Sequence, residues 1–418
     1  MSDTALDASK QHTNYGWQVT LAGLGINLAL GILYTWSVIS KGVPEAWGWS
    51  ATELYLPYAV ACLVFCLVMV PAGRMQDALG PRLVATIGGV LVGVGMILAS
   101  FTQTPLGYVL GFGVFSGAGF GFGYASATPP AVKWFPPAKT GMIAGIVVSG
   151  FGLASVYTAP LSTWLISTLG LQQAVGILGV AFLVVVVILA QLLRPPMPGY
   201  VPSGTPPKLN DGGPAKKEHF LPREMLATWQ FYLLWFLYAC GAGAGLMVIG
   251  ALANIAKLQA GLQLGFLLVA ALAIGNGAGR IIAGVASDKI GRKATLLICF
   301  VSQAGLIGLI SQANTGSPLA SVPVMALVSA LIGANYGANL AIFPSITKDF
   351  YGLKHFGTNY GLVFTAWGVG GFMLAIAAGQ IYDHYHSFAF AYYGSIALLI
   401  AAAAGTLLIK PPHVEHVG

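Results

Sequence analysis

The sequence predicts an all-α membrane protein with twelve transmembrane helices in two pseudo-symmetric bundles of six. Three observations lead to this fold class. Of 418 residues, 56% are hydrophobic and only 7% are charged, whereas about a quarter of the residues in a soluble domain are charged. Apolar runs of roughly 20 residues, the length that crosses a hydrocarbon core as a helix, recur along the whole chain. A polar segment and an internal repeat divide these runs into two halves.

The apolar runs define the expected spans and their orientation. We expect spans at residues 17–39, 51–73, 82–101, 105–128, 140–164, 171–193, 229–256, 264–286, 294–312, 321–346, 358–381 and 388–409. The first sixteen residues lack a signal-peptide pattern, so the first run is expected to remain as a membrane helix. With a cytoplasmic amino terminus, nearly all Lys and Arg residues fall on the cytoplasmic side, which is the positive-inside pattern. We therefore expect a multi-pass protein of the cell inner (plasma) membrane with both termini cytoplasmic. The net charge of +7 then reflects topology, and no nucleic-acid partner is expected.

The polar segment in the middle of the chain is rich in Pro and Gly, as flexible linkers are. It predicts the following organisation: a cytoplasmic tail at 1–16, an amino-terminal bundle at 17–193, a cytoplasmic linker at 194–228, a carboxyl-terminal bundle at 229–410 and a second tail at 411–418.

The internal repeat consists of two similar loop motifs. Gly73-Arg-Met-Gln-Asp77-Ala-Leu-Gly80-Pro-Arg82 follows the second span, and Gly284-Val-Ala-Ser-Asp288-Lys-Ile-Gly291-Arg292-Lys293 follows the eighth. In each copy the acid is expected to pair with nearby basic residues and helix ends and to hold a cytoplasmic gate shut. The predicted gate residues are Asp77, Arg82, Asp288 and Arg292. In a second interpretation, which stays open, these loops are charged only to set the topology.

The two motifs resemble the loop signature of the major facilitator superfamily. Three further stretches are similar to its branch of monocarboxylate transporters and oxalate/formate antiporters: Lys133-Trp-Phe-Pro-Pro-Ala-Lys-Thr-Gly-Met-Ile-Ala-Gly, Leu221-Pro-Arg-Glu-Met-Leu-Ala-Thr, and Ile342-Phe-Pro-Ser-Ile-Thr-Lys-Asp-Phe-Tyr-Gly running on to Thr358-Asn-Tyr-Gly. The resemblance covers nearly the whole chain and is to a bacterial homologue of monocarboxylate transporters. It implies the superfamily fold, with two six-helix bundles around a central cavity, and transport by alternating access.

One charge, Arg280, lies well inside a predicted span. It precedes Asp288 by eight residues, which places it about 12 Å from the loop along a helix. An Arg at a helix centre costs ~2.5–3.5 kcal/mol on insertion scales, and none of the twelve Asp and Glu residues lies in the middle of a span to neutralise it. The guanidinium fork matches a carboxylate, so the anion is expected to arrive as substrate. A structural Arg bound to helix-end carbonyls or a buried acid is the alternative. The equivalent residue of the first repeat is Met69, which favours one carboxylate over two.

The resemblance adds residue roles and two departures. Arg280 matches an arginine that this branch carries in its eighth span. Trp367 stands where the oxalate antiporter has a second cation, which argues against a dicarboxylate. Asn276 stands where animal monocarboxylate transporters carry an Asp implicated in proton coupling, and Asn cannot titrate. The seven histidines lie in tails or loops. The proton is therefore expected to travel through Asp383 or water, or with the acid itself.

Other polar and aromatic residues at similar depth are expected to line the site, although for each aromatic residue packing between helices is an equally good interpretation. The predicted substrate-binding set is Arg280, Asn276, Asn27, Tyr34, Tyr124, Asn335, Tyr336, Asn339, Tyr360, Phe364 and Trp367.

These observations predict a secondary active transporter that moves a small monocarboxylate such as lactate or pyruvate, with proton symport as the expected coupling and carboxylate exchange as the alternative. An intramembrane enzyme is disfavoured because no cluster of His, Cys, Asp or Glu lies at membrane depth. The paired loop motifs favour alternating access over a channel. We expect membrane lipid around the chain, no cofactor or metal, and function as a monomer.

Overall fold

The computed structural model describes residues 14–197, 200, 220–352 and 355–412. The described part of the chain contains twelve helical segments that are long and apolar enough to cross a membrane, which confirms the predicted number. The amino-terminal half contains α1 (Gly16–Leu30), η1 (Gly31–Thr35), α2 (Trp36–Lys41), η2 (Glu45–Trp47), α3 (Ala51–Leu79), α4 (Pro81–Ser100), α5 (Pro105–Tyr108), η3 (Val109–Ser116), α6 (Gly117–Val132), α7 (Pro137–Leu153), α8 (Ser155–Leu169) and α9 (Leu171–Ala190).

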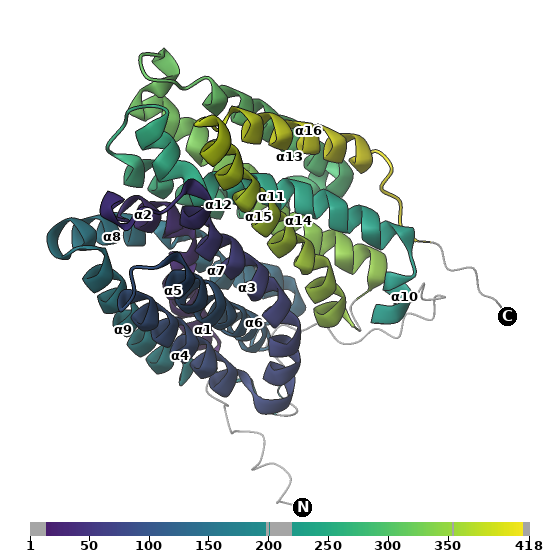
Figure 1. The fold of residues 1–418 in the computed structure, drawn as a ribbon. Helices are drawn as coiled ribbons and strands as arrows, with labels where there is room; N and C mark the ends of the chain where they lie inside the picture. Colours follow the sequence, from purple (N-terminus) through teal and green to yellow (C-terminus); the bar gives the residue numbers. More distant parts are fainter. Residues whose placement is uncertain (1–13, 198–199, 201–219, 353–354, 413–418) are drawn as a thin grey trace, which may run out of the picture.

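The carboxyl-terminal half follows a short helix, α10 (Pro222–Leu226). It contains α11 (Trp229–Leu258), α12 (Gly265–Ile290), α13 (Arg292–Ser311), η4 (Pro318–Ala320), α14 (Val322–Tyr351), α15 (Phe356–Tyr385) and α16 (Ala389–Thr406). In Figure 1 the purple and blue half and the green and yellow half lie against each other. The predicted linker lies largely outside the described residues.

An even number of spans places the ends of the described chain on one side of the bundle, which we call the terminal face. The opposite side, where α2 ends, α3 begins and α15 ends, we call the distal face. Helices α3 and α15 pack along each other between the halves, and α12 packs on α7 and α8. Pairs α4 with α9 and α13 with α16 pack within one half each. The interface between the halves is therefore built by α2, α3, α7, α8, α11, α12 and α15.

Both repeat motifs adopt the same local structure, and it is more helical than the sequence pattern indicates. Helix α3 continues to Leu79 and α12 to Ile290, so Asp77 and Asp288 belong to helix ends. The helices of the spans predicted to end at 73 and 286 are thus longer than predicted, because they continue beyond the apolar segment into polar residues that also favour helix. A single glycine then turns the chain: Gly80 has φ 85° and Gly291 has φ 89°. Residues with a Cβ avoid this backbone region, which explains the glycine in both motifs.

Candidate functional site

Arg280 lies in the interior of the bundle, between the two halves. It is about 15 Å from the end of α12 at Ile290 along the helix axis, and only 7% of its surface is exposed. None of the ion pairs found among the described residues includes Arg280. A buried guanidinium therefore lacks a protein carboxylate partner within the part of the chain that the structure describes.

The contacts of Arg280 leave two donors without partners. Its Nε donates to Asn276 Oδ1 at 3.2 Å, and its Nη1 donates to the carbonyl of Val148 on α7, in the other half, at 2.9 Å. Arg280 Nη2 and Asn276 Nδ2 are buried and have no hydrogen-bond partner among the described residues. A buried donor without an acceptor costs ~1–3 kcal/mol. Two such donors, one of them charged, equal in number the two oxygens of a carboxylate.

Close packing of α12 on α14 fixes Asn276 and Arg280. Glycines of each helix face backbone atoms of the other. An added Cβ would lie 1.8–2.2 Å from the opposite carbonyl oxygen at four positions, namely Gly275, Gly279, Gly333 and Gly337. Spacings of four residues put such glycines on one helix face, where they let backbones approach closely. On the other side, α7 presents Gly152, whose added Cβ would lie 3.3 Å from both Arg280 Nη2 and Asn276 Nδ2. The two donors are therefore held between two closely packed backbones.

A chain of three hydrogen-bonded side chains joins the halves near this arginine. Trp367 Nε1 donates to the Tyr336 hydroxyl at 2.7 Å, and the hydroxyl groups of Tyr336 and Tyr34 are 2.6 Å apart. The two tyrosines hold two hydroxyl protons, and only one can lie between their oxygens. Whichever oxygen donates, one hydroxyl donor of the pair remains without an acceptor among the residues that the structure describes. This chain adds a neutral donor to the polar part of the site.

Aromatic rings surround these polar groups. Tyr124, which lies beside the Arg280 guanidinium, contacts Phe364 with ring centroids 6.4 Å apart, and Phe364 stacks on Trp367 at 5.1 Å. Phe65 of α3 packs on Trp367 at 5.1 Å, and Phe151 of α7 packs on Tyr34 at 5.0 Å. The sequence prediction omits Phe65 and Phe151, along with the Val148 carbonyl. A signal for the two rings was their mid-span position in α3 and α7, but many packing residues share it.

Three predicted residues lie outside this cluster, and a fourth, Tyr360, lies at its edge. Asn27 is buried and donates to the carbonyl of Val147, next to the residue that binds Arg280. Tyr360 lies nearer the terminal face, where its ring packs on Phe364 with centroids 5.7 Å apart and its hydroxyl lies 3.5 Å from that of Tyr238. Asn335 accepts from Ser302 of α13. Asn339 donates to the Asn335 carbonyl. Its Oδ1 faces α11, because a Cβ added at Gly241 of that helix would lie 2.8 Å from it. The structure does not bring Asn335 and Asn339 to the arginine, because their side of α14 faces α11 and α13.

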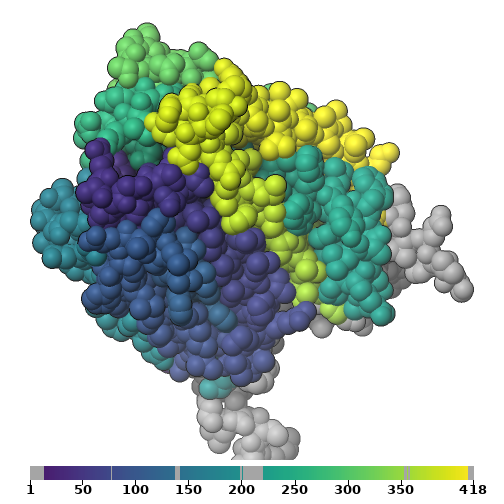
Figure 2. All heavy atoms as spheres, in the orientation of Figure 1, coloured from purple at the N-terminus to yellow at the C-terminus, as the bar shows by residue number. Residues whose placement is uncertain are grey.

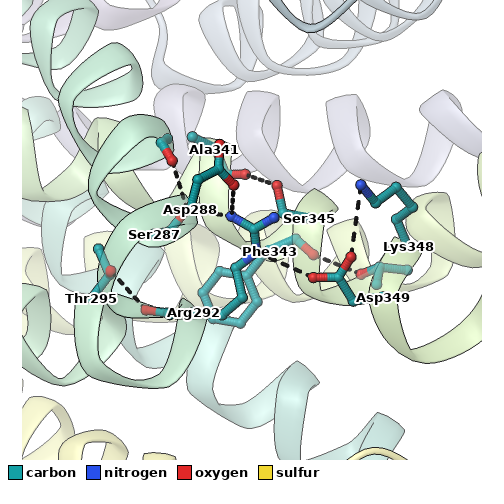
Figure 3. A network of polar contacts seen from close by, with 12 residues as sticks. Ser287, Asp288, Arg292, Thr295, Ala341, Phe343, Ser345, Lys348 and Asp349 are labelled. Carbon is teal, nitrogen blue, oxygen red and sulfur yellow. Dashed lines mark hydrogen bonds and ion pairs between the residues drawn. The ribbon is translucent and has the colours of Figure 1, made fainter. Parts of the chain in front are cut away.

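The repeat motif of the carboxyl-terminal half, predicted to form a gate, makes a polar network within that half (Figure 3). Arg292 Nη1 lies 2.6 Å from Asp288 Oδ1, and its Nε lies 3.2 Å from Asp349 of α14. It also donates to Ser287 Oγ at 2.5 Å. These bonds tie α12, α13 and α14 together. In the other motif, Arg82 donates to the Leu193 carbonyl at 3.0 Å, and the side chain of Asp77 lies outside the described residues.

Asp383 is far from the arginine along the bundle axis. It lies at the end of α15 on the distal face, is exposed, and accepts hydrogen bonds from the start of α3. Its position is therefore on the exposed distal face and not beside the two unpartnered donors.

Comparison with known proteins places this geometry in a family context. The model of the Major Facilitator Superfamily matches residues 19–275 and 234–418. The oxalate:formate antiporter of Oxalobacter formigenes is 27% identical over 361 residues, covering 84% of this chain and 81% of that protein. An uncharacterized MFS-type transporter of Escherichia coli is 27% identical and covers 85% of each chain. Monocarboxylate transporter 13 of Bos taurus is 23% identical and covers 96% of this chain and 90% of its own.

A solved structure shares the fold. The crystal structure of a bacterial homologue of the human lysosomal transporter Spinster, in an inward-facing and unoccupied conformation, superposes with a TM-score of 0.69 and 17% sequence identity. The alignment covers 95% of this chain and 97% of that one. At this identity the likeness concerns the arrangement of the helices alone.

Proposed function

Because the chain belongs to the Major Facilitator Superfamily and is a multi-pass membrane transporter, we propose that it moves a small monocarboxylate, such as lactate or pyruvate, by alternating access. The similarity to the oxalate:formate antiporter and to monocarboxylate transporters confirms the resemblance of its motifs to that branch. The observation that carries the proposal is the buried Arg280 guanidinium with an unpartnered Nη2.

The proposed binding mode uses the two unpartnered donors. One carboxylate oxygen accepts from Arg280 Nη2 and the other from Asn276 Nδ2. Charge-assisted hydrogen bonds of this kind are roughly twice as strong as neutral ones. The spare hydroxyl of the Tyr34 and Tyr336 pair and the rings of Tyr124 and Phe364 would face the rest of the molecule. A second cation is missing at position 367, where Trp367 stands, so one carboxylate is matched better than two.

The proposed coupling is proton symport, and carboxylate exchange is the alternative that the antiporter relative favours. We further propose that the terminal face is cytoplasmic, in the plasma membrane, because the basic loops gather there. In this orientation the Arg292 network, and in the other half the bond from Arg82 to the Leu193 carbonyl, would stiffen the cytoplasmic ends of the halves, where a gate must form and break.

Substitution of Arg280 tests the site. In proteoliposomes, Arg280→Ala should lose lactate uptake, because a charge-assisted bond is worth about 1.5–3 kcal/mol and its loss corresponds to roughly ten- to hundredfold weaker binding. Arg280→Lys should also fail, because an ammonium group cannot bond Asn276, Val148 and substrate in one plane. Lys257→Ala removes an exposed positive charge and should transport normally. Normal uptake and affinity in Arg280→Ala would refute the assignment.

A second measurement separates the two coupling modes. Lactate uptake is recorded with and without an inward proton gradient, and with and without carboxylate inside the vesicles. Stimulation by the proton gradient alone indicates symport, whereas a requirement for internal carboxylate indicates exchange.

A further inference from the structure

The start of α3 on the distal face is hydrogen-bonded by a residue of the other half. Asp383 Oδ1 accepts from the backbone N–H of Ala51 at 2.6 Å, and Oδ2 accepts from the backbone N–H of Thr52 at 2.9 Å. The Thr52 hydroxyl also donates to Oδ2. One carboxylate at the end of α15 thus receives three donors from the first turn of α3.

These donors have no acceptor within α3. The first N–H groups of a helix point away from it without intrahelical partners, and they carry partial positive charge that attracts anions. Part of this need is met locally, because Ser50 and Glu53 cap each other in a capping box. The N–H groups of Ala51 and Thr52 donate to the Asp383 carboxylate instead. The amino terminus of α3 is therefore shared between its own half and the opposite one.

Backbone packing holds Asp383 in register. One turn earlier on α15, an added Cβ at Gly379 would lie 2.7 Å from the Thr52 Cα. The two backbones touch at this point, so the carboxylate reaches the N–H groups directly. Two other bonds join the halves on the same face: Lys41 to the Gln263 carbonyl at 2.9 Å, and Asn254 to Ser40 at 3.1 Å. Figure 2 shows the purple atoms of the first span against yellow-green atoms of the other half in this region.

We propose that Asp383 is a latch that holds the distal face closed by capping α3 from the opposite half. Opening of this face separates α15 from α3 and breaks all three bonds, after which water must satisfy the exposed N–H groups. The energy of this contact biases the equilibrium between conformers toward the distal-closed state. The role depends on the alternating-access fold and is independent of which solute binds Arg280.

Labels on the distal face can measure this equilibrium. Gln173 and Asn314 are exposed on that face, one in each half, and both are replaced by cysteine and spin-labelled in the full-length protein in liposomes. The four native cysteines are buried, and protein without added cysteines gives the labelling background. The fraction of long inter-label distances reports the distal-open state.

Asp383→Asn should raise the ratio of distal-open to distal-closed carrier by about three- to tenfold, since one amide oxygen remains as acceptor and solvent screens an exposed contact. Thr52→Val, which removes only the hydroxyl donor, should shift the ratio in the same direction by less. Glu53→Gln is the matched control: it neutralises a carboxylate at the same helix terminus whose bond to the Ser50 N–H, at 2.8 Å, stays within one half. It should leave the ratio unchanged.

A shift in Asp383→Asn no larger than that in Glu53→Gln, or a shift toward the distal-closed state, would overturn the latch. Substrate affinity recorded for Asp383→Asn keeps the two proposals apart. A changed distance distribution with substrate affinity intact concerns the latch, whereas loss of uptake in Arg280→Ala concerns the binding site, whose arginine also makes a bond between the halves.

Discussion

Gly337→Ala tests whether the packing of α14 on α12 positions the donor pair. A Cβ at this position would lie 2.2 Å from the carbonyl oxygen of Asn276 and 2.9 Å from its side-chain oxygen, whereas ordinary contact begins at 3.4 Å. Both obstructing atoms belong to Asn276, and one of them is backbone that cannot rotate away. The two helices must therefore separate locally by about 1 Å, and Asn276 must move with respect to Arg280.

The magnitude follows from this displacement. Overpacking of this kind costs typically ~1–3 kcal/mol of stability. A misplacement of about 1 Å in a positioned group can cost on the order of 10²-fold in rate. We expect Gly337→Ala to fold with reduced thermal stability and to take up lactate with a ten- to hundredfold lower ratio of maximal rate to half-saturation concentration.

Uptake into proteoliposomes and thermal unfolding are measured for the variant and two controls. Gly305→Ala lies on α13 in open space, with nothing within 4 Å of the added Cβ, and should behave as wild type. Gly95→Ala creates a contact of 2.4 Å with the carbonyl oxygen of Gly111 where α4 packs on η3, in the half that does not contain Asn276. It should lose stability with a smaller loss of uptake per degree of destabilisation. Equal loss of uptake per degree in Gly337→Ala and Gly95→Ala would refute the positioning argument.

Three further substitutions probe the site. Asn276→Asp replaces an unpartnered donor by a carboxylate that pairs with Arg280 and repels the substrate. Uptake should therefore fall at neutral pH and recover as the pH drops and the carboxyl protonates. A ratio of variant to wild-type uptake that does not change with pH would contradict this. Gly152→Ala should weaken substrate affinity at least threefold by crowding both donors. Gly145→Ala, on the same helix with no atom within 4 Å of the new Cβ, should leave the affinity unchanged. Equal affinities of the two variants would show that the substrate does not use the space beside Gly152. Trp367→Phe keeps the stacked ring but removes the N–H donor to the neighbouring tyrosine hydroxyl, so affinity should fall a few-fold in a substrate-competition assay, and unchanged affinity would remove the hydrogen-bonded chain from the site.

Much of the fold was accessible to the sequence because lipid imposes simple requirements. Each span needs a long apolar run, so the twelve spans are readable from composition. The glycines of the two repeat motifs were also recognisable in the sequence. The structure adds that a single glycine with positive φ, Gly80 in one motif and Gly291 in the other, makes each turn. The span ends were less accurate, because a helix does not stop where the hydrocarbon core ends.

The site was only partly predictable. A lone mid-span charge identifies Arg280, and helical spacing adds Asn276. Spacing within one helix does not say which neighbour a face meets, and for this reason Asn335 and Asn339 were grouped with Arg280 although they face α11 and α13. Backbone groups such as the Val148 carbonyl carry no sequence signal. The role of Asp383 at the start of α3 depends on a contact between residues more than 300 positions apart, and such a contact appears only in the folded chain.

The bond from Arg280 to the Val148 carbonyl bears on the return of the unloaded carrier. This bond joins α12 to α7 across the two halves, with a backbone oxygen as the acceptor. A carrier that supplies such a surrogate ligand can bring its halves together around an otherwise unsatisfied cation when no solute is bound. A symporter must make that unloaded transition in every cycle, whereas an obligate exchanger must forbid it. Under the proposed symport, this backbone contact would serve the unloaded transition.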